Sequence, residues 1–448
     1  MSKRSPIGFS ESELEEIPAS TLKMAGQGED LVVLLERTRR KMIRASNGSI
    51  TVLQSWDEAE LGLFFRTKGS TTIGSTLDLS PSGISSSLER LRVAASLSRP
   101  KPSLAPLPGP SKYLPIGGSY DPDLLGSDHI LSEAVETASE AAIREGAERS
   151  AVVMNAEERS WYLASSFGAS AKAKATSAHL VIRSFCGSGS AQSVTASPSL
   201  SGLNPADAGT QSGMEAREAS SPVKGEAGIY DVVLGPSIFA NLIGTLGASA
   251  SAYAVQSGFS YLSNMLGKKV ASEALSIYDD GRLEGGLLLR PFDDEGQPTQ
   301  RTPIIEDGVL KNYLTNSQLS MEMGLPRTGN AGWIEPRPWN LEVGKGDASE
   351  SDLTDGHVLY LTNTWYTRFQ NYSTGEFSTI PRDAIFEFSS GKKVRAVKGL
   401  RLSGNMLEML SRVEALGSQR TLVRWWEVEV PTLLPSVLVR GVRLTSAD

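Results

Sequence analysis

The sequence has no charged residue between Asp231 and Lys268, and a stretch of this length is buried either in a membrane or in a protein core. It contains Pro236, Asn241 and many Gly, Ser and Ala residues, and it lacks the dense Leu, Ile and Val run of a membrane-spanning helix. We therefore predict buried helices in a globular domain, with no membrane as a partner. The polar N-terminal sequence lacks the apolar segment of a signal peptide, so we expect a soluble, cytoplasmic protein.

Length and charge restrict the class of protein further. A chain of 448 residues is longer than most single domains, which predicts two domains. The formal net charge of -7 argues against nucleic acid as a partner. Cys186 is the only cysteine, which excludes an intrachain disulfide and is typical of a reducing compartment.

The first domain is predicted over residues 1–225 and is mixed α/β. The apolar residues of 29–45 recur at intervals of three and four, which predicts an amphipathic helix with a basic C-terminal end. Residues 99–122 are rich in proline and are expected to form an extended connector that crosses the surface. The other predicted helices are 81–98, 132–148 and 205–218, and the predicted strands are 49–54, 61–66, 151–155, 160–166 and 178–186.

The second domain is predicted over residues 226–448 and is richer in strands, so the expected fold class is α+β. It opens with a buried strand at 230–234. Residues 302–314 predict a hairpin, because two apolar runs are joined by Asp307-Gly308, a pair that suits a tight turn. Further strands are predicted at 357–363, 384–388, 394–397, 421–428 and 436–444, and a helix is predicted at 404–416.

No complete catalytic motif is present. The phosphate-binding loop, the dinucleotide fingerprint and the nucleophile elbow are all absent. Zinc needs clustered ligands, but His129, His179 and His357 lie far apart in the sequence. The acidic groups at 279–280 and 293–295 stand next to glycines, which favours turns over acid–base catalysis. The residues alone predict no catalytic and no metal-binding side chain, although a peptidase with a metal site around one histidine stays an open alternative.

Six stretches resemble the TldD/PmbA family, a peptidase family also named for modulation of DNA gyrase. No single stretch is decisive, but their order and spacing over nearly the whole chain make the resemblance specific. The stretches are DLSP at 78–81, VVLGP at 232–236, RPFDDEG at 290–296, TPIIEDGVL at 302–310, TGNAG at 328–332 and VKGLRLSGN at 397–405.

The resemblance implies a heterodimeric metallopeptidase. In that family the TldD subunit carries an H-E-x-x-x-H helix, and a cysteine near its C-terminus completes a zinc site that activates water. The TldE subunit, also called PmbA, lacks this set but is needed for activity. Residues 241–249 of this chain stand where the zinc helix should lie, but they include no His or Glu. The late cysteine is expected near Trp425–Val430, and no cysteine is present there. The resemblance is therefore to TldE, with no zinc in this chain and zinc expected in a TldD-like partner.

The candidate binding residues come mainly from the segment 363–372. It interleaves aromatic side chains with arginine, a mixture typical of peptide grooves and interfaces; a strand with aromatic packing on one face is the alternative. An extended peptide could add to a strand edge there. The candidates for contact with a peptide or an interface are Trp365, Tyr366, Arg368, Phe369, Tyr372, Gly329 and Asn330.

Gly244, Gly247 and Ala248 are predicted to face the partner, because small residues allow close backbone approach; ordinary core packing is the alternative. These observations predict a TldE-like, zinc-free subunit that forms a heterodimer with a zinc-bearing TldD-like subunit and holds unfolded or extended peptide for proteolysis. The rival hypothesis is a stand-alone peptide-binding or regulatory protein on the same scaffold, without hydrolytic activity.

Overall fold

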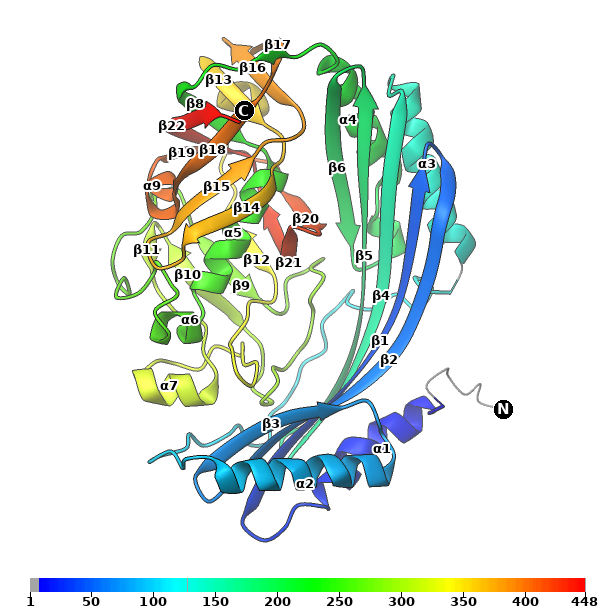
Figure 1. Cartoon of the computed structure of the whole chain (residues 1–448), viewed down its shortest axis with the longest axis vertical. Coiled ribbons are helices and arrows are strands. Elements are labelled where there is room, and N and C mark those ends of the chain that lie inside the picture. The colour runs from blue at the N-terminus through cyan, green and yellow to red at the C-terminus, as the bar shows by residue number, and fades with distance from the viewer. Residues whose placement is uncertain (1–7, 127, 448) are drawn as a thin grey trace.

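The computed structural model describes residues 8–126 and 128–447. The fold is α+β, as predicted, and it consists of a long curved sheet beside a second region that is rich in strands (Figure 1). Within the described residues, no helix is both long and apolar enough to cross a membrane. The sheet and the second region enclose a large cavity between them.

Six antiparallel strands form the first sheet, in the order β3-β2-β1-β4-β5-β6. Its four longest strands have 17 to 19 residues, so at about 3.3 Å per residue each is more than ~50 Å long. One sheet therefore forms a wall along the length of the molecule (Figure 1). The strands are β1 (Glu29–Ser46), β2 (Ser49–Thr67), β3 (Ser70–Thr76), β4 (Arg149–Ser165), β5 (Ser170–Cys186) and β6 (Gly189–Ser197).

The helix predicted at 29–45 is wrong, because this segment is strand β1. Residues Leu31–Leu35 are all buried, since both faces of the sheet are covered there, and a continuous apolar run of this kind fits a helix and a strand equally well. The alternation of the strand divides the basic residues between the two faces. Arg40 lines the cavity, whereas Arg37 points the other way and forms an ion pair with Asp57 at 2.8 Å.

Two pairs of segments that were predicted as separate strands are single strands. Residues 49–54 and 61–66 both belong to β2, and 151–155 and 160–165 both belong to β4, which ends one residue before the predicted strand. The polar residues between them resemble turns in the sequence but pair with β1 without interruption. Their polarity follows from their position in the middle of the sheet, where charged side chains pair across strands.

Four helices cover the face of the sheet that points away from the second region. α1 (Glu11–Leu22) and α2 (Pro81–Leu97) pack over one end of the strands, and α3 (Asp128–Arg144) and α4 (Pro205–Glu218) pack over the other end (Figure 1). The predictions of α2, α3 and α4 are confirmed, with Ser80 as the N-cap of α2. The helix α1 was not predicted.

Helix α4 lies so close to α3 that a glycine is required at the contact. A Cβ atom on Gly209 would lie 2.1 Å from the carbonyl oxygen of Ala138. We expect Gly209→Ala to lower the free energy of unfolding by about 1–3 kcal/mol, because the two helices must separate. The control is Gly244→Ala in the helix at 236–249, where a Cβ atom meets nothing within 4 Å and should be neutral or mildly stabilising. Urea unfolding measures both variants, and equal effects would contradict the close contact.

The proline-rich connector 99–122 is extended, as predicted, but it does not simply cross the surface. Ala105 and Leu107 are buried, and Leu107 belongs to a core cluster that the sheet and the second region share. The Tyr113 hydroxyl donates a hydrogen bond to the carbonyl oxygen of Gly296 at 2.6 Å. The connector therefore runs between the two regions and joins them.

The second region contains two further sheets. One has the order β11-β10-β9-β12-β21-β20, and the other has the order β14-β15-β18-β22-β8-β13-β16-β17-β7, with β19 paired to β22. The predicted hairpin is confirmed, because β10 and β11 are joined by Asp307-Gly308, both with positive φ. The chain enters the second region between the end of α4 at Glu218 and β7, which pairs with β17.

The strands predicted in this region correspond to β8, β13, β16, β17, β20 and β22. The helix predicted at 404–416 is shorter in the structure: it is α9, at 406–411, and the strand β19 follows it. The short helices are η1 (Leu200–Gly202), α6 (Ala252–Gln256), α7 (Ser317–Met323), α8 (Glu350–Leu353) and α9 (Met406–Ser411). The strands are β7 (Val223–Lys224), β8 (Gly228–Leu234), β9 (Ile277–Asp280), β10 (Arg301–Glu306), β11 (Val309–Leu310), β12 (Leu341–Val343), β13 (His357–Leu361), β14 (Trp365–Asn371), β15 (Glu376–Ile380), β16 (Ile385–Ser389), β17 (Lys392–Lys398), β18 (Leu400–Asn405), β19 (Val413–Leu416), β20 (Thr421–Trp425), β21 (Val428–Leu434) and β22 (Val437–Ser446).

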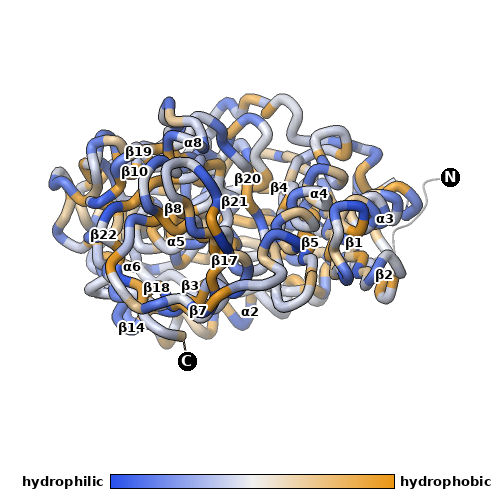
Figure 2. Tube along the Cα trace, turned by 90° about the horizontal axis from the view of Figure 1, so that it is seen from above, coloured by the Kyte–Doolittle hydropathy of each residue, from blue (hydrophilic) through white to orange (hydrophobic). Residues whose placement is uncertain are grey.

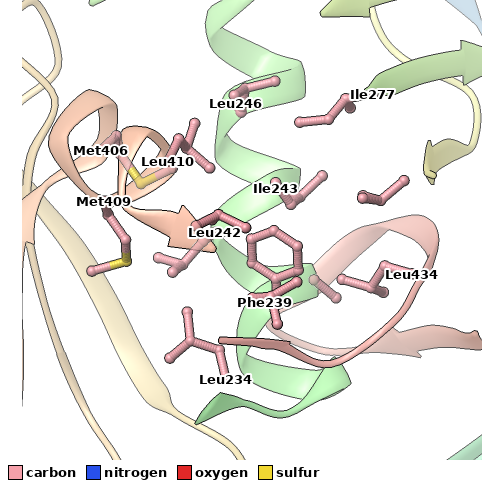
Figure 3. Packing of buried hydrophobic residues seen from close by; sticks show 14 of the residues in the cluster. Leu234, Phe239, Leu242, Ile243, Leu246, Ile277, Met406, Met409, Leu410 and Leu434 are labelled. Atoms are coloured by element: carbon pink, nitrogen blue, oxygen red, sulfur yellow. The ribbon is translucent and has the colours of Figure 1, made fainter. Parts of the chain in front are cut away.

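The uncharged stretch forms the core of the second region. Its helix α5 (Pro236–Ser249) packs against β20 and β21, and Figure 3 shows its apolar side chains among those of the surrounding elements. Leu242, Ile243 and Leu246 are buried. Burial of one such side chain is worth about 1.5–3 kcal/mol, so this helix contributes much of the hydrophobic stabilisation. The prediction of a buried helix is confirmed for α5.

Candidate functional site

A cavity of about 1020 Å³ lies between the sheet and the second region, and we call it the central cleft. Its size is at the upper end of the range of about 300–1,000 Å³ that is usual for small-molecule pockets. The cleft is lined by β1, β4, β5 and β6 on one side. On the other side it is lined by loops near residues 288 and 338, by Trp365 and by the β20–β21 hairpin. Seen from above, β20 and β21 lie on the side of the second region that faces the sheet (Figure 2).

Four aromatic rings pack together on the second region's side of the cleft. Trp365 lies edge-to-face against Trp425 and Trp426, with ring centroids 5.5 and 5.4 Å apart. The ring centroids of Tyr366 and Trp426 are 5.7 Å apart. Trp425 is buried, whereas Trp426 is 51% exposed. Rigid aromatic rings provide a large contact area at a small cost in conformational entropy, so this group is suited to binding peptide side chains.

Glu427 connects the aromatic group with helix α5. Its carboxylate accepts the backbone N–H groups of Tyr366 at 2.6 Å and Thr367 at 3.2 Å. Asn241 Nδ2 of α5 donates to the Glu427 carbonyl oxygen at 2.8 Å and to its carboxylate at 3.3 Å. The Glu427 side chain is only 4% exposed. Asn241 lies where the family resemblance expects a zinc helix, and Glu427 lies where it expects the late cysteine.

The residues at this location do not fit a zinc ion. Zinc in proteins takes clustered Cys, His and carboxylate ligands, whereas α5, β20 and β21 contain no histidine and no cysteine. The carboxylates here are those of Glu427 and Glu429, and that of Glu427 is already occupied by N–H donors. Among the residues that the structure describes, no group of three or more His, Cys, Asp or Glu side chains could hold a metal ion.

An arginine of the sheet reaches across to the second region. Arg183 of β5 donates to Asp383 at 2.8 Å. The same carboxylate accepts hydrogen bonds from Ser190 Oγ at 2.5 Å, Asn363 Nδ2 at 2.6 Å and Trp365 Nε1 at 3.3 Å. The Asp383 side chain is fully buried. Charge-assisted hydrogen bonds of this kind are strong, so they hold the two sides of the cleft at a fixed distance.

A second arginine connects the two sides elsewhere. Arg290 is 1% exposed, and its guanidinium forms an ion pair with Asp294. It also lies over the rings of Trp339, at 4.7 Å, and of Trp161 in β4, at 5.6 Å. Arg337 donates to the same Asp294 carboxylate at 3.1 Å. Two arginines therefore share one carboxylate, and the buried one also packs on the sheet.

The structure places the aromatic candidates in two groups. Of these candidates, Trp365 lines the central cleft and Tyr366 lies next to Trp365. The Arg368 guanidinium lies 5.7 Å from the centroid of the Tyr366 ring. Phe369 and Tyr372 are instead stacked on each other with centroids 5.4 Å apart, and neither lines the cleft. Phe369 lies in β14 and Tyr372 directly follows it. A role in peptide binding or at an interface stays a prediction for all five residues.

Gly329 and Asn330, predicted to contact a peptide or an interface, are buried and do not line the central cleft. Asn330 is fully buried and its Nδ2 donates to Asp279 at 2.5 Å. The carbonyl oxygen of Gly329 accepts the indole N–H of Trp339, which does line the cleft. Both residues therefore support the cleft wall from behind.

The residues of α5 that were predicted to face a partner lie in different environments. Gly247 is buried, and a Cβ atom there would meet Leu341 at 2.8 Å, which matches the alternative of core packing. Ala248 is exposed and Gly244 is half-buried with open space beside it. Contact with a partner stays a prediction for these two.

Two residues of the acidic groups, Asp280 and Asp293, act as turn residues. Asp293 Oδ1 accepts the N–H groups of Glu295 at 3.0 Å and Gln297 at 2.9 Å. Asp280 Oδ1 accepts the N–H of Arg282 at 2.8 Å in the same way. Their hydrogen bonds are those expected for aspartate in a turn.

The three histidines lie on separate elements. His129 begins α3 and His357 begins β13, and both side chains are exposed. His179 lines the central cleft, where its Nε2 lies 3.2 Å from Asn155 Nδ2. Burial and the nearby positive charge of Arg424 lower the pKa of His179 to about 4, so it is neutral at pH 7.

The lowered pKa predicts a loss of stability in mild acid. The unfolded chain binds a proton at His179 near pH 6.5, but the folded chain binds it only near pH 4, so stability is lost as the pH falls through this window. We expect the free energy of unfolding to fall by about 2 kcal/mol more between pH 7 and pH 5 in the native chain than in His179→Gln. Urea unfolding at both pH values measures this. His357→Gln is the control and should keep the native dependence; an unchanged dependence in His179→Gln would contradict the prediction.

One part of the cleft lining was not predicted, although its composition marks it in the sequence. The segment 424–427 (RWWE) interleaves aromatic and charged residues as 363–372 does, and three of its residues line the cleft. The same compositional rule would have selected it. No comparable signal marks the residues contributed by β4 and β5, because they are scattered along alternating positions of two long strands.

Comparison with known proteins assigns the second region to a family. Residues 227–446 match the family model described as the PmbA/TldA metallopeptidase C-terminal domain. A metalloprotease of Methanothermobacter thermautotrophicus is 31% identical over 217 residues, 45% of this chain and 45% of the relative. Metalloprotease PmbA of Escherichia coli O157:H7 is 28% identical over 214 residues, 46% of each chain. The similarity therefore spans less than half the length of these two relatives.

Two solved structures share the fold along the chain. A protein of Thermotoga maritima described as a modulator of a DNA gyrase has a TM-score of 0.86 at 22% identity, covering 96% of this chain and 100% of its own. TldE from Thermococcus kodakarensis has a TM-score of 0.84 at 19% identity, covering 96% and 99%. The chain therefore has the fold of these two proteins. The C-terminal domain of the chain, residues 227–446, is of the PmbA/TldD metallopeptidase family.

Proposed function

We propose that the chain is a TldE-like subunit, without zinc of its own, of a TldD/TldE-type metallopeptidase complex. The observation that carries the proposal is the hydrogen bond between Asn241 and Glu427, because it stands where the family's zinc ligands are expected. These two residues do not fit zinc. Zinc in a TldD-like partner would supply the activated water and the polarised carbonyl group for hydrolysis.

In this proposal the central cleft holds an unfolded or extended peptide. Trp365, Trp425 and Trp426 offer apolar surface to its side chains, and the charged residues of β1, β4 and β5 offer polar partners. The ion pair of Arg183 with Asp383 and the packing of Arg290 on Trp161 join the two sides of the cleft and hold its width. A preformed cleft loses little free energy to reorganisation when it binds a flexible peptide.

Co-expression with a TldD-like protein that carries H-E-x-x-x-H tests the proposal. We expect the two chains to purify as a complex that cleaves unfolded peptides faster than the TldD-like protein alone, while this chain alone cleaves none. Trp426→Ala in this chain should weaken the peptidase activity of the complex, and Trp56→Ala, an exposed tryptophan of β2 outside the cleft, is the matched control. Absence of a complex, together with no gain in cleavage, would favour a stand-alone binding protein instead.

A further inference from the structure

Strand β14 begins with a bulge at the rim of the central cleft. The pairs Trp365–Ile380 and Arg368–Ser378 leave two residues of β14 opposite one residue of β15. Tyr366, the first of these two, has a φ of 60°. In bulges with this geometry the first residue is usually glycine, because a larger side chain is strained at positive φ. A tyrosine at this position therefore needs surrounding contacts that hold its backbone there.

Glu427 provides these contacts. The backbone N–H groups of Tyr366 and Thr367, the two residues of the bulge, both donate to the Glu427 carboxylate, at 2.6 and 3.2 Å. The Glu427 side chain is only 4% exposed, so water competes little for these charge-assisted hydrogen bonds. Glu427 follows Trp426 in the turn between β20 and β21. One turn therefore holds the bulge with its carboxylate and supplies the indole ring next to Tyr366.

Three rings meet at this rim and leave part of their surface uncovered. The ring centroids of Trp365, Tyr366 and Trp426 lie 5.4 to 6.1 Å apart, and the rings are inclined to one another by 59 to 64°. Tyr366 is 45% exposed and Trp426 is 51% exposed. The Arg382 guanidinium already lies 5.7 Å from the Trp365 and Tyr366 rings, so a cationic ligand would meet a like charge there. The exposed rings therefore suit an uncharged aromatic side chain, which packs edge-to-face or offset against them.

We infer that Tyr366 and Trp426 form a subsite for an uncharged aromatic side chain of the bound peptide, and that Glu427 is the residue that positions this subsite. Glu427 acts through the backbone of Tyr366 and does not touch the ligand. The inference rests on the proposed function, because it requires that an extended peptide lies along the central cleft, which Trp365 and Trp426 line.

Titration calorimetry on the full chain with three peptides of equal length tests the subsite. Each peptide is acetylated, amidated and rich in alanine and serine, and its central residue is Phe, Ala or Lys. We expect the Phe peptide to bind about 10-fold more tightly than the Ala peptide, and the Lys peptide to bind no more tightly than the Ala peptide. Tyr366→Gly keeps the left-handed backbone but removes the ring, so the preference for Phe should fall below about 3-fold.

Variants of Glu427 test the positioning role. Glu427→Ala should lower the Phe preference as far as Tyr366→Gly does, because Tyr366 then relaxes from positive φ and its ring moves away from Trp426. Near-ultraviolet circular dichroism of the ligand-free variant should report the rearranged rings. Glu427→Gln keeps one acceptor oxygen and should retain part of the preference. In a Tyr366→Gly background, Glu427→Ala should change the preference no further, since the two residues act as one unit.

Asp231→Ala is the control for a general loss of stability. The Asp231 carboxylate also accepts a backbone N–H group, that of Gly441 at 2.9 Å, but Asp231 does not line the cleft. This variant should keep both the Phe preference and the near-ultraviolet spectrum.

The possible failures are distinguishable. Equal binding of the Phe and Ala peptides to the native chain would overturn the subsite and leave peptide binding intact. A Phe preference that survives Glu427→Ala would overturn the positioning role, and if that variant does not fold, an undiminished preference in Tyr366→Gly would overturn the subsite instead. If none of the three peptides binds the native chain, the proposed peptide cleft fails and the subsite fails with it.

Discussion

Asp294→Ala is expected to lower the free energy of unfolding by about 3–5 kcal/mol. The substitution removes the carboxylate that pairs with Arg290, which is 1% exposed and has no access to bulk water. The guanidinium of Arg337 loses the same partner but is 53% exposed, so water can replace it. The expected loss of stability therefore arises from Arg290, whose charge remains buried between Trp339 and Trp161 without its carboxylate partner.

A double-mutant cycle isolates this cause. In an Arg290→Met background the cavity wall stays filled but carries no charge, so Asp294→Ala should then cost at least 2 kcal/mol less than in the native chain. Urea unfolding of the four proteins gives the coupling energy. Equal costs in the two backgrounds would mean that Asp294 stabilises the protein through its backbone turn and not through Arg290.

Asp383→Ala is expected to lower the free energy of unfolding by about 3 kcal/mol, near the lower end of the range for a broken buried pair. Arg183 is 22% exposed and can be partly hydrated after the substitution, but the donors Asn363 and Ser190 also lose their acceptor. Because Arg183 belongs to the sheet and Asp383 to the second region, the variant should also loosen the cleft. Faster proteolysis of the connector 99–122 under native conditions reports this opening.

Two further variants set the scale for Asp383→Ala. Asp383→Asn keeps one acceptor oxygen and should lose less stability than the alanine variant. Glu414→Ala breaks an ion pair with Arg440 in which both side chains are more than 40% exposed, and we expect a loss below about 1 kcal/mol. If Glu414→Ala and Asp383→Ala cost the same, burial does not give the Asp383 pair its strength.

The sequence predicted correctly those elements that depend only on residues close together in the chain, such as a helix cap and a tight turn. The N-cap at Ser80 and the Asp307-Gly308 turn were read from residue types that favour one backbone conformation, and both are present. The uncharged stretch predicts buried core helices because it lacks both charge and the dense Leu, Ile and Val run of a membrane-spanning helix. The resemblance to the TldD/PmbA family added the family assignment, which no residue pattern alone could have given.

The sheet and its side of the cleft could not be predicted because they depend on register. The charges of β1 are satisfied by residues far away in sequence, such as Glu157 for Arg40 and Glu158 for Arg39. Without these partners, a basic segment after an apolar run resembles the end of an amphipathic helix. Cross-strand pairing, which no single segment encodes, determines which side chains line the cleft.

The pairing of distant strands also has a consequence for how the chain folds. In the first sheet β1 pairs with β4, as in Val32 with Ser165, and in the second region β8 pairs with β22, as in Leu234 with Val437. Neither sheet can close until segments more than a hundred residues apart have met, and such a high contact order makes folding slow. During that interval the strands β1 and β8 expose apolar residues and unpaired edges, so refolding yield should fall as protein concentration rises.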